Sequence, residues 1–162
     1  MERSEKIHVQ IGQVKTGREG QSLNAILGSC VGIGFLHRDR RIFGLAHCLL
    51  AQSGTRAPSK SDLGGRHVDQ AIRSLEALMK ISDEERRRVR VFLCGGANMS
   101  LPPDTDPKRL VGTTNAEFAR KAIREAGFRL SHHDLGGMLG RQVTIDCTSG
   151  EYAITEIPRL GM

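Results

Sequence analysis

The sequence predicts an α+β fold with two amphipathic helices between two groups of strands. Apolar runs typical of strands lie toward both ends of the chain, and apolar residues at helical spacing occupy the middle. At 162 residues the chain has the length of one compact domain, so we expect residues 1–162 to form a single domain. The fold class is therefore a layered α+β protein, with a mixed or antiparallel sheet packed against two main helices.

The first half of the chain predicts one strand and one hairpin. Residues 7–11 alternate apolar and polar side chains, as a half-buried strand does. Residues 31–37 and 42–50 are apolar runs around the charged residues 38–41, which is typical of a hairpin. Residues 51–65 are rich in Ser, Gly, Pro and Lys and predict a loop.

Two helices follow from periodicity and end signals. An amphipathic helix over residues 67–80 is indicated by four apolar residues at helical spacing: Val68, Ile72, Leu75 and Met79. A second helix is expected to begin at Thr114, because Thr114 and Glu117 have the spacing of a capping box. It should end at Ala126, where Gly127 supplies a left-handed stop.

The remaining segments predict strands and one irregular stretch. Residues 89–94 form a short buried strand that ends at two glycines, and three prolines keep residues 102–107 out of regular structure. Strands are expected over residues 128–132, 141–148 and 152–157, the last two joined by a turn at Ser149 and Gly150.

Composition excludes several classes of protein. No run of about 20 apolar residues exists for a membrane span, and residues 1–6 lack the apolar core of a secretory signal. We therefore expect a cytoplasmic protein with no membrane insertion, whose four cysteines are reduced. The formal net charge is +6, but aromatic residues are only 4% with no Trp, which disfavours nucleic-acid binding.

The informative pair is Cys30, just before the first hairpin strand, and His47, near the end of the second. Two registers place both side chains on one sheet face: either Cys30 lies opposite His47, or Gly32 does and Cys30 is diagonal to it. Their Cβ atoms would then lie within about 4.5–8 Å. A one-residue slip would put them on opposite faces.

A thiol beside an imidazole is a nucleophile beside a base. An imidazolium neighbour lowers a thiol pKa, so an activated Cys30 should alkylate at about pH 6–7, below the ~8.5 midpoint of a free thiol. The imidazole can then protonate a leaving amine, while Gly28 allows close approach and backbone N–H groups near Cys30 stabilise an oxyanion. From spacing alone a structural interpretation stays open, with Cys30 a small buried hydrophobe and His47 a satisfied histidine.

Four blocks of the chain resemble, in order, the signature segments of the CheD family, and the resemblance covers residues 7–157. They are Leu27-Gly28-Ser29-Cys30-Val31 with Gly44-Leu45-Ala46-His47; Phe92-Leu93-Cys94-Gly95-Gly96-Ala97-Asn98-Met99; Gly112-Thr113-Thr114-Asn115; and Asp134-Leu135-Gly136-Gly137-Met138-Leu139-Gly140-Arg141. One block would be weak evidence, but four in the family's order are strong.

The resemblance implies a chemoreceptor glutamine deamidase. CheD proteins hydrolyse the side-chain amide of selected glutamines on chemoreceptor cytoplasmic domains, leaving glutamate and releasing ammonia. Their fold is a layered α/β sandwich similar to bacterial toxin deamidases, and many bind the phosphatase CheC. On this chain Cys30 would be the nucleophile, forming a thioester, and His47 the general base and acid. The resemblance implies no metal and no organic cofactor, and we expect the protein alone to be a monomer.

The residue that orients His47 is less well defined by the sequence. The family commonly has a Thr six residues before the Cys, and here that position is Asn24. An Asn carbonyl accepts an imidazole N–H in the known Cys-His-Asn set, so Asn24 is the candidate, with orientation from elsewhere left open. Residues 67–69, His-Val-Asp, also depart from the family's Tyr-x-Asp.

Other interpretations are weighed against the deamidase. A non-catalytic regulator would use the same fold to bind CheC or receptors, and a thiol protease or acyltransferase would share the nucleophile. His132 and His133 are adjacent on a predicted strand and point to opposite faces, which favours a structural role over a metal site. Cys48 should face away from Cys30, Cys94 and Cys147 are expected in the core, and Gly95-Gly96 lacks the rest of a phosphate-binding loop.

Overall fold

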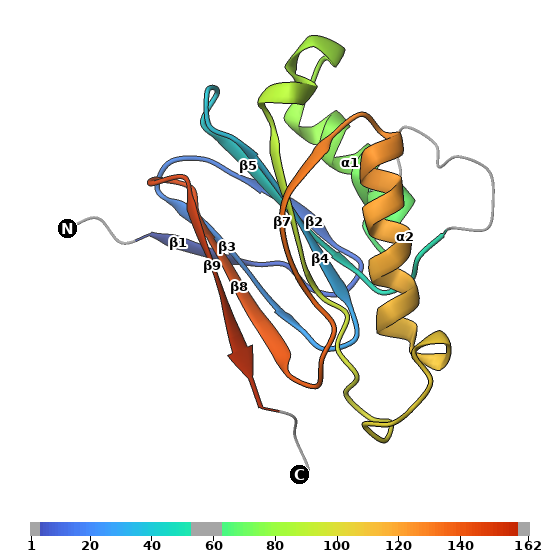
Figure 1. Ribbon diagram of the computed structural model, residues 1–162. Coiled ribbons are helices and arrows are strands. Elements are labelled where there is room, and N and C mark those ends of the chain that lie inside the picture. Colours follow the sequence, from blue (N-terminus) through green and yellow to red (C-terminus); the bar gives the residue numbers. More distant parts are fainter. Residues whose placement is uncertain (1–3, 53–62, 159–162) are drawn as a thin grey trace.

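The strands form two sheets instead of one, and the two sheets and two helices make three layers (Figure 1). The computed structural model describes residues 4–52 and 63–158. The strands are β1 (Glu5–His8), β2 (Val14–Gly17), β3 (Gln21–Leu27), β4 (Val31–His37), β5 (Ile42–Cys48), β6 (Arg90–Gly95), β7 (Arg129–Leu135), β8 (Gly140–Asp146) and β9 (Glu151–Ile157). The helices are α1 (Val68–Met79) and α2 (Val111–Glu125), with short 3-10 turns η1 (Asp83–Arg88) and η2 (Pro107–Arg109).

Strand pairing explains the layers. The four-stranded sheet has the order β1-β3-β8-β9 and the five-stranded sheet the order β2-β5-β4-β6-β7. β1 and β3 are parallel, as are β6 and β7, while the other pairs are antiparallel. Both helices cover the face of the five-stranded sheet that points away from the other sheet (Figure 1). The predicted α+β class and mixed pairing are confirmed.

The five-stranded sheet is covered on both faces, which produces two apolar cores. One core lies between this sheet and the helices, and the other lies between the two sheets. Along β5 the side chains alternate between them: Ala46 and Cys48 belong to the helix side, and Phe43 and Leu45 to the space between the sheets. Every residue of β4 and β5 is buried, as expected of central strands covered on both faces.

Two strands near the N-terminus were not predicted. β2 and β3 lie where the sequence analysis expected no element, because their Lys, Thr, Gln and Asn residues weaken the apolar signal. The first strand also ends earlier than expected, at His8, and the chain turns over residues 10–13. β7 extends to Leu135, beyond its predicted end, because its polar residues pair with β6 and so remain in strand conformation.

The helices show one confirmed end and one wrong start. α1 agrees with the prediction, and Gly127 has a φ of +87° directly after the α2 C-cap, as a left-handed stop requires. The predicted capping box at Thr114 is wrong: α2 begins at Val111 with Leu110 as N-cap, and Thr114 lies inside the helix. The preceding turn η2 leads directly into α2 and starts the helix early.

The predicted loop 51–65 lies largely outside the residues that the structure describes. Residues 53–62 of the predicted loop 51–65 lie outside the described residues, as do residues 1–3 at the N-terminus. Within residues 4–52 and 63–158, no helix is long and apolar enough to cross a membrane.

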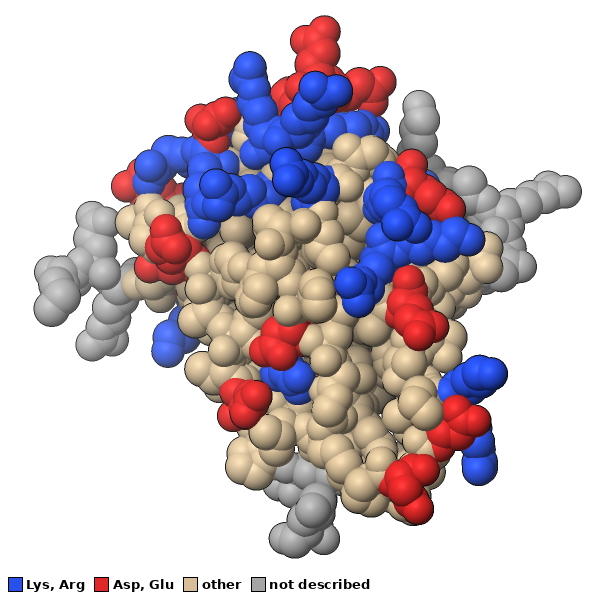
Figure 2. Space-filling view, viewed as in Figure 1, with Lys and Arg blue, Asp and Glu red and all other residues tan. Residues whose placement is uncertain are grey.

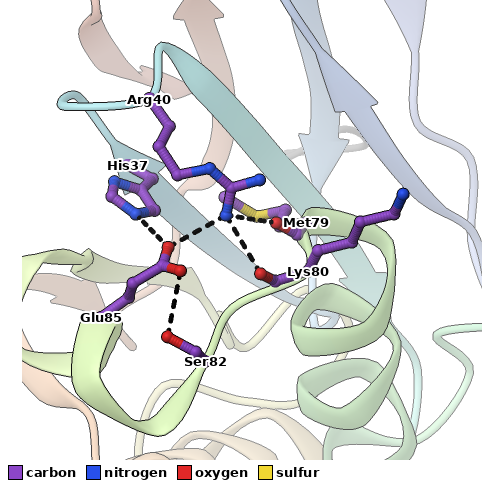
Figure 3. A network of polar contacts seen from close by, with 6 residues as sticks. All are labelled: His37, Arg40, Met79, Lys80, Ser82 and Glu85. Atoms are coloured by element: carbon purple, nitrogen blue, oxygen red, sulfur yellow. Dashed lines mark hydrogen bonds and ion pairs between the residues drawn. The ribbon is translucent and has the colours of Figure 1, made fainter.

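The tip of the β4–β5 hairpin is tied to α1 and η1 by a polar network (Figure 3). His37 Nε2 and Arg40 Nη1 approach the same oxygen of Glu85, at 2.7 and 2.9 Å. Arg40 Nη1 also donates to the carbonyls of Met79 and Lys80, at the end of α1. The hydrogen bonds from His37 and Arg40 lower the pKa of Glu85 to about 2, so the carboxylate is charged at neutral pH.

Candidate active site

Cys30 and His47 lie on the same face of the five-stranded sheet. In the β4–β5 hairpin Gly32 is opposite His47 and Val31 opposite Cys48, which leaves Cys30 diagonal to His47. This is one of the two registers that the sequence allowed. Cys30 belongs to the core between the sheets, and the alternation along β5 points His47 into the same space.

Three contacts from residues 9–13 hold His47 in place. Its backbone N–H donates to the Gln13 carbonyl at 3.0 Å, and its carbonyl accepts from Gly12 N at 2.8 Å. Its ring nitrogen Nδ1 lies 3.0 Å from the Val9 carbonyl oxygen. Because a carbonyl only accepts, Nδ1 carries the hydrogen of the neutral ring, and Nε2 keeps the lone pair that a general base needs.

Burial favours the neutral form of both Cys30 and His47. Cys30 is 6% exposed and His47 is 4% exposed. Burial raises the pKa of Cys30 above its ordinary value of 9.0. Burial lowers the pKa of His47 below 6.5, and the hydrogen bond to Val9 offsets part of that shift. Both pKa shifts favour a neutral thiol and a neutral imidazole in this arrangement, and the expectation of a thiol activated at pH 6–7 stays a prediction for the labelling experiment.

Two glycines, Gly95 and Gly96, lie close to the backbone of Cys30. Gly96 N donates to the Cys30 carbonyl at 2.9 Å, and Ala97 N donates to the Gly28 carbonyl at 3.0 Å. Gly95 has a φ of +99°, and a Cβ atom there would overlap the Cys30 carbonyl oxygen. The backbone of residues 95–97 thus fixes the loop that carries Cys30, and only glycine permits this approach at position 95.

A second loop braces the first. Gly136 N donates to the Gly95 carbonyl at 2.9 Å, and Asn98 N donates to the Gly137 carbonyl at 2.8 Å. Arg141, 5% exposed, holds this second loop by pairing with Asp134 at 3.1 Å and donating to backbone carbonyls within it. Asp134 and the glycines of this segment therefore shape a tight loop packed against residues 95–98.

Asn24 is not bonded to His47 through its side chain. Its Oδ1 accepts from Thr144 Oγ1 at 2.8 Å, and its Nδ2 donates to Ser22 Oγ at 3.2 Å. Its backbone carbonyl accepts from Val9 N at 2.7 Å. The group that bonds the His47 ring is the Val9 carbonyl, which the sequence analysis missed because a main-chain acceptor leaves no signature in residue type.

The other candidates have structural surroundings. All four cysteines are free and buried, and Cys48 lies in the helix-side core, away from Cys30 as expected. Burial raises the pKa of Cys94 to about 12 and that of Cys147 to about 11, so both are inert thiols. His132 Nδ1 lies 2.8 Å from the Tyr152 hydroxyl. Among the described residues no group of three or more His, Cys, Asp or Glu side chains is placed to hold a metal ion.

Part of the basic surface lies at the end of the five-stranded sheet away from Cys30. On the face shown in Figure 2, Lys and Arg gather toward the top, where η1 and the first residues of β6 and β7 lie in Figure 1. Exposed members of this region are Arg87, Arg88, Arg90 and Arg129. Because β4 is antiparallel to β6, Arg90 pairs with Leu36 near the hairpin tip, whereas Gly95 pairs with Val31 beside Cys30. These arginines and the candidate site therefore lie toward opposite ends of the sheet.

The fold and the site define an α+β protein with a buried thiol and imidazole on one sheet face. A family described as CheD chemotactic sensory transduction matches residues 49–156, starting two residues beyond His47. A relative from Ruegeria sp. (strain TM1040), named a probable chemoreceptor glutamine deamidase CheD 2, is 58% identical over 96% of this chain and 94% of its own. The chain belongs to the CheD family.

More distant similarities extend this comparison. A probable chemoreceptor glutamine deamidase CheD from Methanococcus maripaludis strain C5 is 32% identical over 91% of this chain and 93% of its own. Among solved structures, the hypothetical protein YfiH of Bacillus licheniformis has a TM-score of 0.45 at 13% identity, covering 85% of this chain and 60% of that one. That structural likeness is too low to support an argument about function.

Proposed function

We propose that this protein hydrolyses the side-chain amide of glutamines on chemoreceptor cytoplasmic domains, giving glutamate and ammonia. Membership of the CheD family and the names of its relatives support the deamidase activity. The observation that carries the proposal for the site is the placement of Cys30 and His47 on one buried face, with His47 Nδ1 bonded to a carbonyl. We further propose that the protein acts in the cytoplasm as a monomer and that CheC is a partner.

The acylation half of the reaction starts from the neutral pair. His47 Nε2 accepts the Cys30 proton as the sulfur attacks the carboxamide carbon, and the C=O electrons move onto oxygen. Backbone N–H groups near Cys30 stabilise that oxyanion. The tetrahedral intermediate collapses when the imidazolium gives its proton to the amide nitrogen. The C–N bond breaks, ammonia leaves, and a thioester joins Cys30 to the substrate.

Hydrolysis of the thioester regenerates the enzyme. His47 Nε2 takes a proton from water as the water oxygen attacks the thioester carbon. The C–S bond then breaks, the thiol recovers its proton from His47, and the product is glutamate. In both halves the imidazolium is transient, and the Val9 carbonyl stabilises it by accepting the Nδ1–H. No step requires a metal or an organic cofactor.

We propose that Asn24 positions His47 indirectly: the Asn24 main chain holds Val9, and Val9 holds the imidazole. The Asn24 carbonyl accepts from Val9 N, and the Val9 carbonyl bonds the imidazole. A main-chain contact of this kind is available to any residue type, which explains how Asn is tolerated where the family commonly has Thr. The Asn24 side chain then serves β3–β8 pairing, through Thr144.

The test is ammonia release and mass spectrometry of receptor cytoplasmic fragments incubated with the protein. The parent protein should release ammonia and convert specific glutamines to glutamate without cutting the backbone. Cys30→Ala should release no ammonia and form no glutamate. Cys48→Ala is the matched control, because Cys48 is also buried but faces the other core. Ammonia release by Cys30→Ala would overturn the assignment of the nucleophile. Cleaved peptide bonds would favour a thiol protease, and no reaction by the parent protein would favour a non-catalytic regulator.

A further inference from the structure

The first turn of α2 carries a signature block, Gly112-Thr113-Thr114-Asn115, that takes no part in the proposed proton transfers. Gly112 and Asn115 are three residues apart, so they lie on the same face of the helix. Gly112 is buried and Asn115 is 2% exposed, so this face is turned into the protein. A buried amide side chain is stable only with hydrogen-bond partners, and those partners indicate what the block does.

Asn115 ties the start of α2 to the end of β5. Its amide nitrogen Nδ2 donates to the Leu49 carbonyl at 2.7 Å. Leu49 directly follows Cys48, the last residue of β5, and lies two residues beyond His47. The hydrogen bond therefore joins the helix to the strand that carries the imidazole.

Gly112 packs against the main chain that holds Cys30. A Cβ atom at Gly112 would overlap the Gly96 carbonyl oxygen, and a Cβ atom at Gly96 would lie 2.8 Å from the Gly112 carbonyl oxygen. Gly96 N in turn donates to the Cys30 carbonyl at 2.9 Å. Two glycines without side chains allow this approach, so the turn that holds the end of β5 also contacts the loop of the thiol.

Cys30 depends on such support because it lies just outside the paired strands. β4 begins at Val31, which pairs with Cys48 on β5. This pairing fixes the position of His47, but it ends one residue short of Cys30. The place of the thiol relative to the imidazole is therefore set by the groups that pack on the loop, and α2 contacts both that loop and β5.

We propose that Asn115 is a positioning residue, which holds the first turn of α2 on Leu49 and so sets the place of the Cys30 thiol relative to the His47 imidazole. Its effect on rate rests on the proposed function. Proton transfer from Cys30 to His47 requires the two heavy atoms within about 2.6–3.2 Å, so a small shift of the loop lowers the rate while every reacting group stays present. Asn115 acts through the main chain of Leu49 and touches none of the reacting atoms.

Steady-state kinetics test the assignment, each variant being assayed well below its melting temperature. Asn115→Ala should lower kcat for a receptor cytoplasmic fragment about 10–100-fold and leave KM within about 3-fold, because the pair is displaced and the substrate-binding surface is intact. Ser131→Ala is the matched control: Ser131 Oγ also donates to a main-chain carbonyl, that of Val91, at 2.9 Å, and Val91 pairs with Phe35 toward the other end of β4. The control should keep kcat within about 2-fold. An unchanged kcat in Asn115→Ala, a loss confined to KM, or an equal loss of kcat in the control would each overturn the proposal.

Gly112→Ala disturbs the same contact from its other side. The added Cβ pushes the helix away from Gly96, so kcat should again fall at least about 10-fold. Combined with Asn115→Ala, the loss should be smaller than the product of the two single losses, because both substitutions loosen one contact between α2 and the loop. Losses that multiply would show that the two residues act independently and would overturn the role of Asn115 as the anchor of this turn.

Hydrogen exchange separates this inference from the proposed function, because it requires no substrate. The amides of Gly96 and Ala97 bond the loop that carries Cys30. Their exchange should be at least about 10-fold faster in Asn115→Ala and should change less than about 2-fold in Ser131→Ala. Faster exchange in Asn115→Ala alone, in a protein whose parent form releases no ammonia, would retain the positioning role and refute only the deamidase function. Unchanged exchange of both amides in Asn115→Ala would overturn the positioning role even in an active enzyme.

Discussion

The β4–β5 hairpin carries a buried histidine at each end, and the two histidines are held in opposite ways. His37 is 1% exposed and lies 2.7 Å from the Glu85 carboxylate, whereas His47 is 4% exposed and lies 3.0 Å from the Val9 carbonyl. The partner of His37 is a charged carboxylate, and their contact links the β4–β5 hairpin to η1. A carbonyl only orients the ring, so burial decides the charge of His47 and leaves it a neutral base. The two histidines of one hairpin therefore differ in the kind of group that holds the ring, a carboxylate for His37 and a main-chain carbonyl for His47.

Exchanging each histidine for glutamine should produce the largest contrast. His47→Gln removes the base, and deamidation should fall about 10³-fold or more, because general acid–base catalysis is lost in both halves of the reaction. His37→Gln should leave the rate within about 3-fold and lower the melting temperature by about 5 °C, since it weakens the link to Glu85. Ammonia release and thermal unfolding measure the two effects. A loss of activity in His37→Gln comparable with that in His47→Gln would break the comparison.

Gly95→Ala should produce the next largest loss of activity, because Gly95 lies beside Cys30. A Cβ at this position meets the Cys30 carbonyl oxygen and the residue keeps a positive φ, so the loop that carries Cys30 must move. We expect activity to fall about 10–100-fold and stability to fall by about 2 kcal/mol. Gly20→Ala is the control: its φ is +88°, but an added Cβ meets no atom within 4 Å. It should lower stability by about 1 kcal/mol and keep the rate. Equal rates in the two variants would show that the loop position is not critical.

The pH dependence of kcat/KM and of Cys30 alkylation should distinguish a neutral thiol and imidazole from a thiolate–imidazolium ion pair. Because burial lowers the pKa of His47 below 6.5, kcat/KM should decline only as the pH falls below that value, where the base becomes protonated. Because burial raises the pKa of Cys30 above 9.0, its alkylation rate without substrate should still be rising at pH 9. Iodoacetamide labelling followed by mass spectrometry measures this rate. A plateau of labelling at about pH 6–7 would instead indicate a thiolate–imidazolium pair.

Glu85→Gln should change how the stability of the protein depends on pH below 4.5, and it should leave the rate of deamidation unchanged. The folded-state pKa of Glu85 is lowered from 4.5 to about 2, so its contribution is present above pH 4.5 and is lost as the pH falls toward 2. The variant should therefore be less stable than the parent at neutral pH, and the difference should shrink between pH 4.5 and 2. Urea unfolding at several pH values measures it. A constant difference across this range would show that the carboxylate charge is not responsible.

Asn24→Ala should have the smallest effect on the reaction. The main-chain contact from the Asn24 carbonyl to Val9 survives the substitution, so kcat should change less than about 3-fold. The lost hydrogen bond to Thr144 should lower stability by about 1 kcal/mol. Asn24→Thr, which restores the residue common in the family, serves as the comparison. A loss of about 100-fold or more in Asn24→Ala would show that its side chain acts on His47 directly.

The sequence predicted the elements with strong apolar signals and missed those defined by their partners. The hairpin, α1 and the turn at Ser149 and Gly150 follow from local patterns and are confirmed. β2 and β3 were missed because their polar residues are compatible with a strand only once neighbouring strands supply hydrogen bonds. The start of α2 was misplaced because the capping-box pattern at Thr114 is local, whereas η2 sets where the helix begins.

By itself the sequence determined the α+β class, the family resemblance and the two side chains of the candidate site. Those conclusions depend on residue type and spacing, which the chain carries directly. Only the tertiary structure decided the hairpin register, the Val9 carbonyl as partner of His47, and the burial that shifts the pKa of Cys30 up and that of His47 down. The reason is physical: register, main-chain hydrogen bonds and burial arise from segments far apart in the chain. Residues 9–13, 95–98 and 136–141 gain their roles only when the two sheets pack around Cys30.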